Sequence, residues 1–543
     1  MKRFKLFLAM AALACAIGLT VKYGSTYRPV VEPVREIEEI WALEDAREES
    51  GEPLVTRLFC NGVPMAYDAE NNVFYGSLGL ENGAQWPEIK LTACEEAAMG
   101  LSLCFADDYG FDDCDAAIRE GYSYQIFAYT DTAYSYAEVV FTGLPLVNVT
   151  ADQTIEREDV PAQIEIALAA EGLQTNGRIH KRGGASILND KVGYKLEFTR
   201  TTDGKKKIYR EIPGMGTDSQ VILLPMNALD TTMMRDRLSW ALYARLTRRD
   251  EPFSARKTQY CELFLNGEYR GVYLMLEPFS VRQEVAKAGE ERLTTDSVYR
   301  TAVISLSHGR PCMEDPYSAA TGFELYYPMD GEPDFSPLAD YFALLGETDD
   351  AAFMRRAAQI IDLDSALRYD VVLQLFGLTD NVINNMYTWA QNSRGHTRYR
   401  FDFWDLDVSW GLKRDEIGEM HENWVFFPLV DRLLRADEEG GVRKRYGEIY
   451  REVREKAFDA ETVEALVGQY AHELNDSGAM ARNAERWETE NYAADGYELV
   501  AFAAERIALL DEPVRAMSAG EEIDLRFLEK TNYDDKGTPL TEE

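Results

Sequence analysis

Asp380, Asn385 and Asp405 are the residues whose types and spacing most clearly permit chemistry. The asparagine follows the first aspartate by five positions, and the second aspartate comes after a short β-forming stretch. Transfer of a phosphoryl group depends on positioned charge, namely a carboxylate that orients the attacking hydroxyl and oxygen ligands that hold magnesium. An isolated Asp–Asn loop is ordinarily a turn or a helix cap. The ordered combination of the three residues is what favours phosphoryl transfer.

Two expected strands connect these polar residues. Residues 387–390 and 399–403 are rich in β-forming types and are separated by a turn-like segment. Because a hairpin brings its two ends together, we expect Asp380, Asn385 and Asp405 to share one metal–nucleotide site. Protein kinases use the same order of a catalytic Asp, an Asn five residues later, a hairpin and a metal-binding Asp.

Three further elements are expected to frame this unit. An amphipathic helix with apolar residues at 363, 367, 371 and 375 runs toward Asp380. Two β-rich runs within 261–276 flank Asn266-Gly267, a pair that accepts positive φ at both turn positions and therefore predicts a hairpin. A third element, a helix capped by Thr231 or Thr232, is expected to carry the apolar stripe Met234, Leu238, Leu242 and Leu246.

The composition limits the class of protein. With 543 residues, of which 46% are hydrophobic, the chain is expected to fold into two or three domains. The 94 acidic and 57 basic residues give a net charge of −37, which disfavours binding to nucleic acid and is compatible with a basic protein partner. The five histidines are not spaced as zinc ligands, so a zinc hydrolase is disfavoured.

The N-terminus resembles a targeting segment. Lys2, Arg3 and Lys5 precede an apolar run over residues 6–21, which is the order found in secretory signals. An uncleaved membrane anchor is the alternative. Export makes one or two disulfides plausible, and their pairing stays open; four cysteines lie in one stretch, namely Cys60, Cys94, Cys104 and Cys114.

Several motifs in one order carry a family resemblance. Over about residues 145–515 the chain resembles the CotH (spore coat protein H) kinase family. The resemblance rests on RGGAS at 182–186, KVGYKLEF at 191–198, LLPMN at 223–227, MRD at 234–236, ELFLNGEYRGVYL at 262–274, DNVINN at 380–385 and WDLD at 404–407.

The resemblance implies an α+β fold: an atypical protein kinase-like fold with a β-rich N-terminal lobe, a helical C-terminal lobe and ATP between them. It implies that Asp380 is catalytic, and that Asn385 and Asp405 bind Mg²⁺ with Asp407 as a helper. Leu378-Thr379 replaces the His-Arg that precedes the catalytic Asp in ordinary protein kinases, which fits the atypical family better.

The resemblance also implies the ATP contacts. Lys191 matches the first lysine of the family's strand motif and is the expected phosphate-binding lysine. Lys195 is its rival, because it lies more squarely within the strand. Arg182 is expected to reach a phosphate, and the segment around Glu277 to contact adenine through its backbone.

The function implied is that of an exported atypical protein kinase, at the cell surface or membrane-anchored. It would transfer the γ-phosphoryl group of ATP to Ser or Thr of a surface, envelope or coat protein. A non-catalytic surface or coat-assembly protein on the same fold is the alternative, and transfer of a group other than phosphate is a third. The expected organisation is a leader (1–27), a linker (28–52), a small all-β, sandwich-like domain (53–144), a kinase-like domain (145–516) and an acidic tail (517–543).

Overall fold

The computed structural model describes most of the chain and divides it into two compact units. Unit 1 comprises residues 1–220, 260–273 and 473–492, and unit 2 comprises 221–259, 274–472 and 493–543. The described residues are 31–33, 37–80, 89–93, 102–105, 114–183, 185–226, 230–246, 255–279, 296–302, 322–328, 334–393, 396–412, 424–425, 427–521, 532–533 and 539–540. The expected leader, Cys94 and most of the expected tail lie outside them. Among the described helices, none combines the length and the apolar character needed to cross a membrane.

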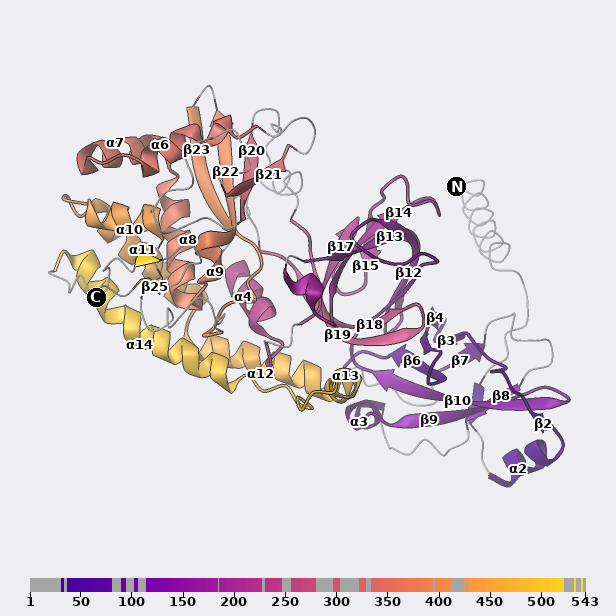
Figure 1. The fold of residues 1–543 in the computed structure, drawn as a ribbon. Helices are drawn as coiled ribbons and strands as arrows, with labels where there is room; N and C mark the ends of the chain where they lie inside the picture. Colours follow the sequence, from indigo (N-terminus) through magenta and orange to yellow (C-terminus); the bar gives the residue numbers. More distant parts are fainter. Residues whose placement is uncertain are drawn as a thin grey trace, which may run out of the picture. The chain divides into compact units, whose positions relative to one another are not determined.

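The N-terminal region of unit 1 is built mainly of β-strands (Figure 1). A mixed sheet has the order β1 (Val31–Pro33), β8 (Ser102–Phe105), β9 (Ser123–Tyr129), β10 (Ala133–Thr142), β6 (Val73–Ser77) and β5 (Ala66–Asp68), with β2 (Glu48–Glu49) paired to β10. A smaller sheet has the order β4 (Val63–Pro64), β3 (Leu58–Cys60) and β7 (Leu91–Ala93), and two helices accompany the sheets, α2 (Ile37–Asp45) and α3 (Cys114–Arg119). The stretch expected to be a linker thus contributes β1, α2 and β2, because its backbone pairs in parallel with β8 and β10.

Three cysteines of unit 1 are buried. Cys60 and Cys114 are buried and carry no disulfide, and Cys261 is likewise free and buried. Burial raises the pKa of the Cys60 thiol to about 12, with a smaller contribution from Cys114. These thiols therefore pack as small apolar side chains. The disulfides expected for this stretch do not involve Cys60 or Cys114.

A closed barrel follows the N-terminal sheets. Its strand order is β11 (Leu146–Thr150), β12 (Val160–Leu168), β13 (Glu171–Arg182), β14 (Gly193–Thr199), β17 (Gln220–Leu224), β19 (Glu268–Leu276) and β18 (Thr258–Leu265). Leu196 and Phe198 alternate with polar residues along β14 and are fully buried, as the period of two requires. Asn266 and Gly267 have φ values of 54° and 78°, which confirms the predicted Asn-Gly turn. Strands β15 (Arg210–Ile212) and β16 (Gly216–Asp218) form a separate two-stranded sheet.

The hairpin β18–β19 receives a short helix from far along the chain, α13 (Ala479–Trp487). Arg482 donates from Nε and Nη2 to the fully buried carboxylate of Glu262, at 2.9 and 2.8 Å, and Tyr269 donates its hydroxyl to the same group at 2.6 Å. At Gly271, with φ of 86°, an added Cβ would lie 2.5 Å from Oδ1 of Asn483. Helix α13 therefore packs against residues of the motif at 262–274.

Unit 2 combines a four-stranded sheet with helices. The sheet has the order β21 (Phe323–Tyr327), β20 (Ser297–Ala302), β22 (Asn384–Ser393) and β23 (His396–Phe403). Its helices are α4 (Arg235–Ala244), α6 (Ala339–Leu345), α7 (Asp350–Ile360), α8 (Leu363–Phe376), α9 (Asp380–Ile383), α10 (Pro428–Arg435), α11 (Gly441–Lys456), α14 (Tyr497–Ala519) and most of α12 (Ala460–Asp476) (Figure 1). The described chain is thus α+β, as expected.

The elements predicted around the polar residues are present. Helix α8 begins after Asp362, whose carboxylate accepts from the Ser365 amide at 3.2 Å, and it ends at Gly377 with φ of 66°. Strands β22 and β23 form the predicted hairpin, which is longer than expected. Helix α4 buries its predicted apolar stripe. The predicted cap at Thr231 or Thr232 is wrong, because the helix begins after Met234, which makes no side-chain capping bond; the Arg235 amide donates to Oδ2 of Asp230 at 3.2 Å.

Candidate functional site

Asp380 begins the short helix α9, and three residues separate it from Phe376, the last residue of α8. Its side chain is buried, with a relative exposure of 0%. Oδ2 accepts from Nδ2 of Asn385 at 2.8 Å, and Oδ1 accepts from Nδ2 of Asn384 at 3.3 Å. Because Asn385 points its amide nitrogen at the carboxylate, its oxygen is the end that remains to bind a cation.

Asn381 connects the two ends of the hairpin. Its Nδ2 donates to the carbonyl of Trp404 at 2.7 Å, and the Trp404 amide donates to the carbonyl of Asn385 at 2.9 Å. Asp405 directly follows Trp404, so the segments that carry Asp380 and Asp405 lie together, as the sequence predicted. Asn381 is fully buried, and its Oδ1 has no hydrogen-bond partner within the described part of the chain.

Two of the predicted metal ligands have an uncommon backbone conformation. Asn385 and Asp405 both have φ of 57°, in the left-handed region. Such a conformation costs on the order of 1–3 kcal/mol for a residue other than glycine and persists where the surroundings impose it, often at functional sites. Asp405 and Asp407 are half-buried in the segment after β23. The strain therefore coincides with the residues predicted to bind metal.

Arg300 is a cation of this site that sequence analysis missed. It lies on β20, opposite Tyr387 of β22, and its Nη2 is 2.6 Å from Oε2 of Glu324. Burial lowers the pKa of Arg300, but Glu324, Tyr387 and Asp405 outweigh this and hold the pKa above its ordinary value. The Asp405 carboxylate therefore acts electrostatically on the Arg300 guanidinium. Residues 282–345 have no clear sequence pattern, so nothing in the sequence singled out Arg300.

The available donors suit a hard cation such as magnesium only in part. Asn385, Asp405 and Asp407 offer oxygen ligands, which magnesium prefers. Among the described residues, however, no group of three or more His, Cys, Asp and Glu side chains is placed to hold a metal ion. Magnesium in nucleotide sites is typically held by one or two carboxylates together with water and phosphate oxygens. The donor set fits an ion that arrives with the nucleotide.

Lys191, predicted to bind phosphate, is engaged within unit 1. Its Nζ donates to the carbonyl of Val272 at 2.6 Å and to Oδ1 of Asn483 at 2.9 Å. It also lies 5.1 Å from the ring centre of Tyr273. Burial lowers the pKa of Lys191 to about 7, and Arg270 adds to this. The ammonium group therefore joins α13 to the barrel hairpin.

Lys195 and Arg182 lie among other cations on neighbouring strands of unit 1. Lys195 pairs with His180 in the register of β13 and β14, and Arg182 pairs with Gly193. Burial lowers the pKa of Lys195, followed by repulsion from Lys207, with Arg182 contributing as well. A half-buried lysine among like charges is suited to an anion. The role predicted for either residue stays a prediction.

Glu277, predicted to lie at the adenine hinge, is already paired within unit 2. Its amide donates to the carbonyl of Lys257 at 2.9 Å, and its Oε2 accepts from the Lys257 amide at 3.2 Å. These bonds extend the pairing beyond the end of β19. A backbone contact to a base would have to use another group of this segment.

Comparison with known proteins gives one finding for this arrangement. The family model described as CotH kinase protein matches residues 179–510, which is more than half of the 543 residues. The match includes the barrel strand with Lys195 and the hairpin that separates Asn385 from Asp405. No curated protein matches the chain. The chain belongs to the CotH kinase protein family.

Proposed function

We propose that this protein transfers the γ-phosphoryl group of ATP to a hydroxyl group of a protein. The family supports a kinase-like protein in general. The observation that carries the proposal is the junction of the two segments: Asn385 donates to the Asp380 carboxylate at 2.8 Å and accepts from the Trp404 amide at 2.9 Å. A carboxylate, an amide oxygen and the residue before Asp405 therefore meet at one end of a hairpin.

In this proposal Asp380 orients the attacking hydroxyl and accepts its proton. Asn384 and Asn385 fix the carboxylate through one hydrogen bond to each oxygen. A carboxylate oxygen can accept more than one hydrogen bond, so this arrangement is compatible with a substrate hydroxyl that donates to Asp380. Asp380 is enclosed while both asparagines are half-buried, so the hydroxyl approaches from the asparagine side.

Asn385 and Asp405, with Asp407 as a helper, would hold magnesium bound to the phosphates. The ion would neutralise the charge on the phosphate oxygens. Arg300 is the nearby cation that would contribute to the same neutralisation within unit 2. Lys195 and Arg182 are retained as candidate phosphate ligands of unit 1, whereas Lys191 has its ammonium group engaged.

Phosphate transfer from radiolabelled ATP tests the proposal. The purified protein, with magnesium, is expected to label itself or a basic serine-containing protein such as myelin basic protein. Asp380→Ala and Asp405→Ala are each expected to lower labelling at least about 100-fold. Asp131→Ala, in the exposed turn between β9 and β10, is the control and should leave labelling unchanged. Full labelling by both active-site variants would refute the assignment.

We infer an extracytoplasmic substrate from the charged and apolar N-terminal residues. A surface, envelope or coat protein is the class that an exported kinase would meet. A net charge of −37 favours a basic acceptor over an acidic one. Cell fractionation tests the location, because a protein confined to the cytoplasmic fraction would contradict it.

A non-catalytic binding protein on the same fold is the second candidate. Two observations favour it: the β-rich N-terminal region lies outside the family match, and the net charge of −37 suits binding to a basic partner. A thermal-shift measurement distinguishes the two. A kinase is expected to melt at a higher temperature with ATP and magnesium together than with either alone. An unchanged melting temperature would favour the non-catalytic protein.

A further inference from the structure

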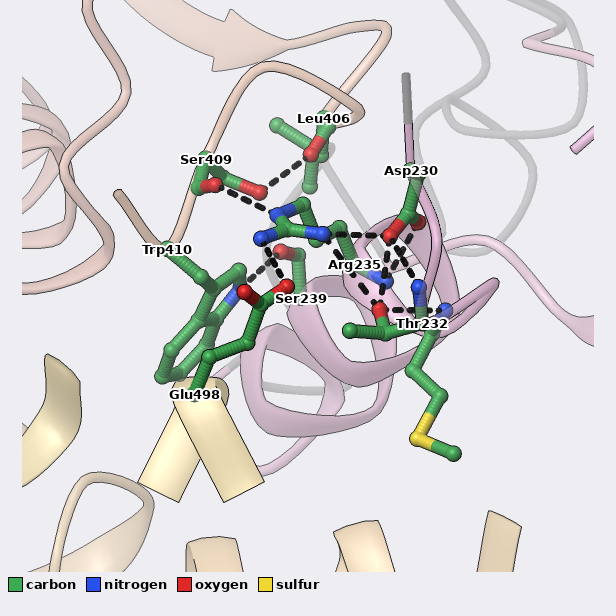
Figure 2. Close-up of polar contacts among 9 residues, drawn as sticks. Asp230, Thr232, Arg235, Ser239, Leu406, Ser409, Trp410 and Glu498 are labelled. Atoms are coloured by element: carbon green, nitrogen blue, oxygen red, sulfur yellow. Dashed lines mark hydrogen bonds and ion pairs between the residues drawn. The ribbon is translucent and has the colours of Figure 1, made fainter. Parts of the chain in front are cut away.

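Arg235, at the start of α4, has a buried guanidinium that contacts the segment following Asp405. It is 3% exposed. Nε donates to the carbonyl of Ser409 at 3.0 Å, Nη1 donates to Asp230, and Nη2 donates to Oε1 of Glu498 at 2.7 Å. Figure 2 shows the guanidinium between these three partners. All three nitrogens are thus used, and one of them holds the segment that follows Asp405 and Asp407.

Two other residues of α4 hold the same segment. The carboxylate of Asp236 accepts from the amide of Leu406 at 3.1 Å. The hydroxyl of Ser239 accepts from Nε1 of Trp410 at 2.9 Å (Figure 2). Residues at i, i+1 and i+4 of one helix therefore fix three points of residues 406–410.

The segment also closes on itself and on the end of α8. Ser409 donates its hydroxyl to the carbonyl of Leu406 at 2.6 Å, and its amide donates to the carbonyl of Asp407 at 3.1 Å. The Trp410 amide donates to the carbonyl of Phe376, the last residue of α8, at 2.8 Å. Asp407 thus lies inside a loop whose backbone is fixed on both sides.

The backbone strain shows why such support is needed. Asp405 and Trp410 have φ of 57° and 53°, left-handed values that residues other than glycine rarely adopt. Strain of this kind persists only where the surroundings over-determine it. The contacts from α4 fall at Leu406, Ser409 and Trp410, next to or at the strained residues. A buried ion pair is weak support for stability in general, so a positioning role gives Arg235 a reason to be there.

We propose that Arg235, together with Asp236 and Ser239, positions the Asp405–Asp407 segment for metal binding. This inference rests on the proposed function, in which Asp405 and Asp407 hold magnesium. Arg235 and Asp236 hold the backbone at Ser409 and Leu406, and Ser239 holds the side chain of Trp410, so the proposal gives none of the three a contact with substrate or metal. They are positioning residues, and Glu498 supports them by anchoring the outer edge of the guanidinium to α14.

Hydrogen–deuterium exchange of the peptide that spans residues 404–410 tests the positioning without nucleotide and without activity. Arg235→Lys keeps the charge but cannot reach Ser409, Asp230 and Glu498 together. Asp236→Ala removes the acceptor of the Leu406 amide, whereas Asp236→Asn keeps one. We expect exchange of this peptide to become at least fivefold faster in the first two variants and to stay near wild type in the third.

The magnesium dependence of phosphate transfer tests the link to the metal. In Arg235→Lys and Asp236→Ala the half-saturating magnesium concentration is expected to rise five- to tenfold, while turnover at saturating magnesium falls less than threefold. Glu498→Ala is expected to raise the half-saturating magnesium concentration about twofold. The Glu498 side chain is 53% exposed, so its loss should leave the fold intact. Glu505→Ala, on the exposed side of the same helix, is the matched control and should change nothing.

The outcomes separate the two proposals. An inactive wild-type protein refutes the proposed function, and faster exchange confined to residues 404–410 would still support positioning by α4. An active wild type whose variants show unchanged exchange overturns the positioning. Faster exchange with an unchanged magnesium dependence overturns the link to the metal. Faster exchange throughout unit 2, with a matching fall in melting temperature, also overturns it, because a merely structural role would act in that way.

Discussion

Lys191→Met tests whether the lysine of the family's strand motif has a structural role in this protein. Nζ of Lys191 is held by two neutral acceptors, Val272 O at 2.6 Å and Asn483 Oδ1 at 2.9 Å. Burial lowers its pKa from 10.5 to about 7. The unfolded chain therefore binds this proton more tightly than the folded chain, and the stability that involves Lys191 rises with pH between these two values.

The size of the effect follows from the linkage relation. Each unit of pKa difference corresponds to ~1.4 kcal/mol. From pH 7 to about pH 9.5 the wild type should therefore gain on the order of 3 kcal/mol relative to Lys191→Met, which has no proton to lose. At neutral pH the two proteins should be similar in stability, because loss of two hydrogen bonds is offset by removal of a poorly solvated charge.

Thermal unfolding of both proteins across this pH range is the assay. Lys195→Met is the comparison variant, because Lys195 is half-buried as Lys191 is, but its ammonium group lies among cations rather than between two neutral acceptors. The difference in melting temperature between wild type and Lys191→Met should widen in favour of the wild type as the pH rises. A difference that stays constant with pH would refute the assignment of Lys191 as a structural lysine held between two neutral acceptors. ATP-induced stabilisation that is lost in Lys191→Met but kept in Lys195→Met would restore Lys191 as the phosphate ligand.

Two further predictions concern single buried positions. Burial raises the pKa of Asp370 from 3.8 to about 8, so the free energy of unfolding of the wild type should fall as the pH rises from about 4 to 8. Asp370→Asn should remove this loss and stabilise unit 2 by a few kcal/mol at neutral pH, as measured by chemical denaturation. Equal pH dependence of stability in both proteins would contradict this prediction. Gly271→Ala should destabilise unit 1 by ~2–4 kcal/mol, because φ is 86° and the new Cβ would lie 2.5 Å from Asn483 Oδ1. Gly62→Ala, with φ of 83° and open space around it, is the control for the backbone cost alone, so equal losses in both variants would deny the packing argument.

Local patterns in the sequence predicted the parts of the site that depend on short-range geometry. A hairpin must bring its ends together, and Asn-Gly must accept positive φ, so the placement of Asn385 beside Trp404 and the turn at Asn266 follow from neighbouring residues alone. The Asp380–Asn385 hydrogen bond belongs to the same class, since five positions separate the partners. The family match agrees with the motifs from which the resemblance was drawn.

Contacts between distant segments could not be predicted in this way. Lys191 was predicted to bind phosphate, and no local pattern could show that its ammonium group donates to Asn483, which lies 292 positions away. Arg300 lies in a region without a periodic pattern, and only the pairing of β20 with β22 brings it to Asp405. The parallel pairing of β1 with β8 likewise has no local signal, so a stretch rich in charge and proline was predicted to be a linker.

Asp405 and Arg235 differ in how well the sequence reveals them: Asp405 is a candidate metal ligand, and Arg235 holds the segment that follows it. The residue types needed at the metal are fixed by chemistry, because a hard cation requires oxygen, and they stand out in the sequence. The residue that holds Ser409 needs only a donor of the right reach, and its position on α4 is set by how that helix packs rather than by spacing along the chain. The left-handed φ of Asp405 connects the two, because a strained residue at the proposed metal site requires support from elsewhere. Supporting residues of a site such as this are therefore found by asking which buried polar groups contact the strained backbone.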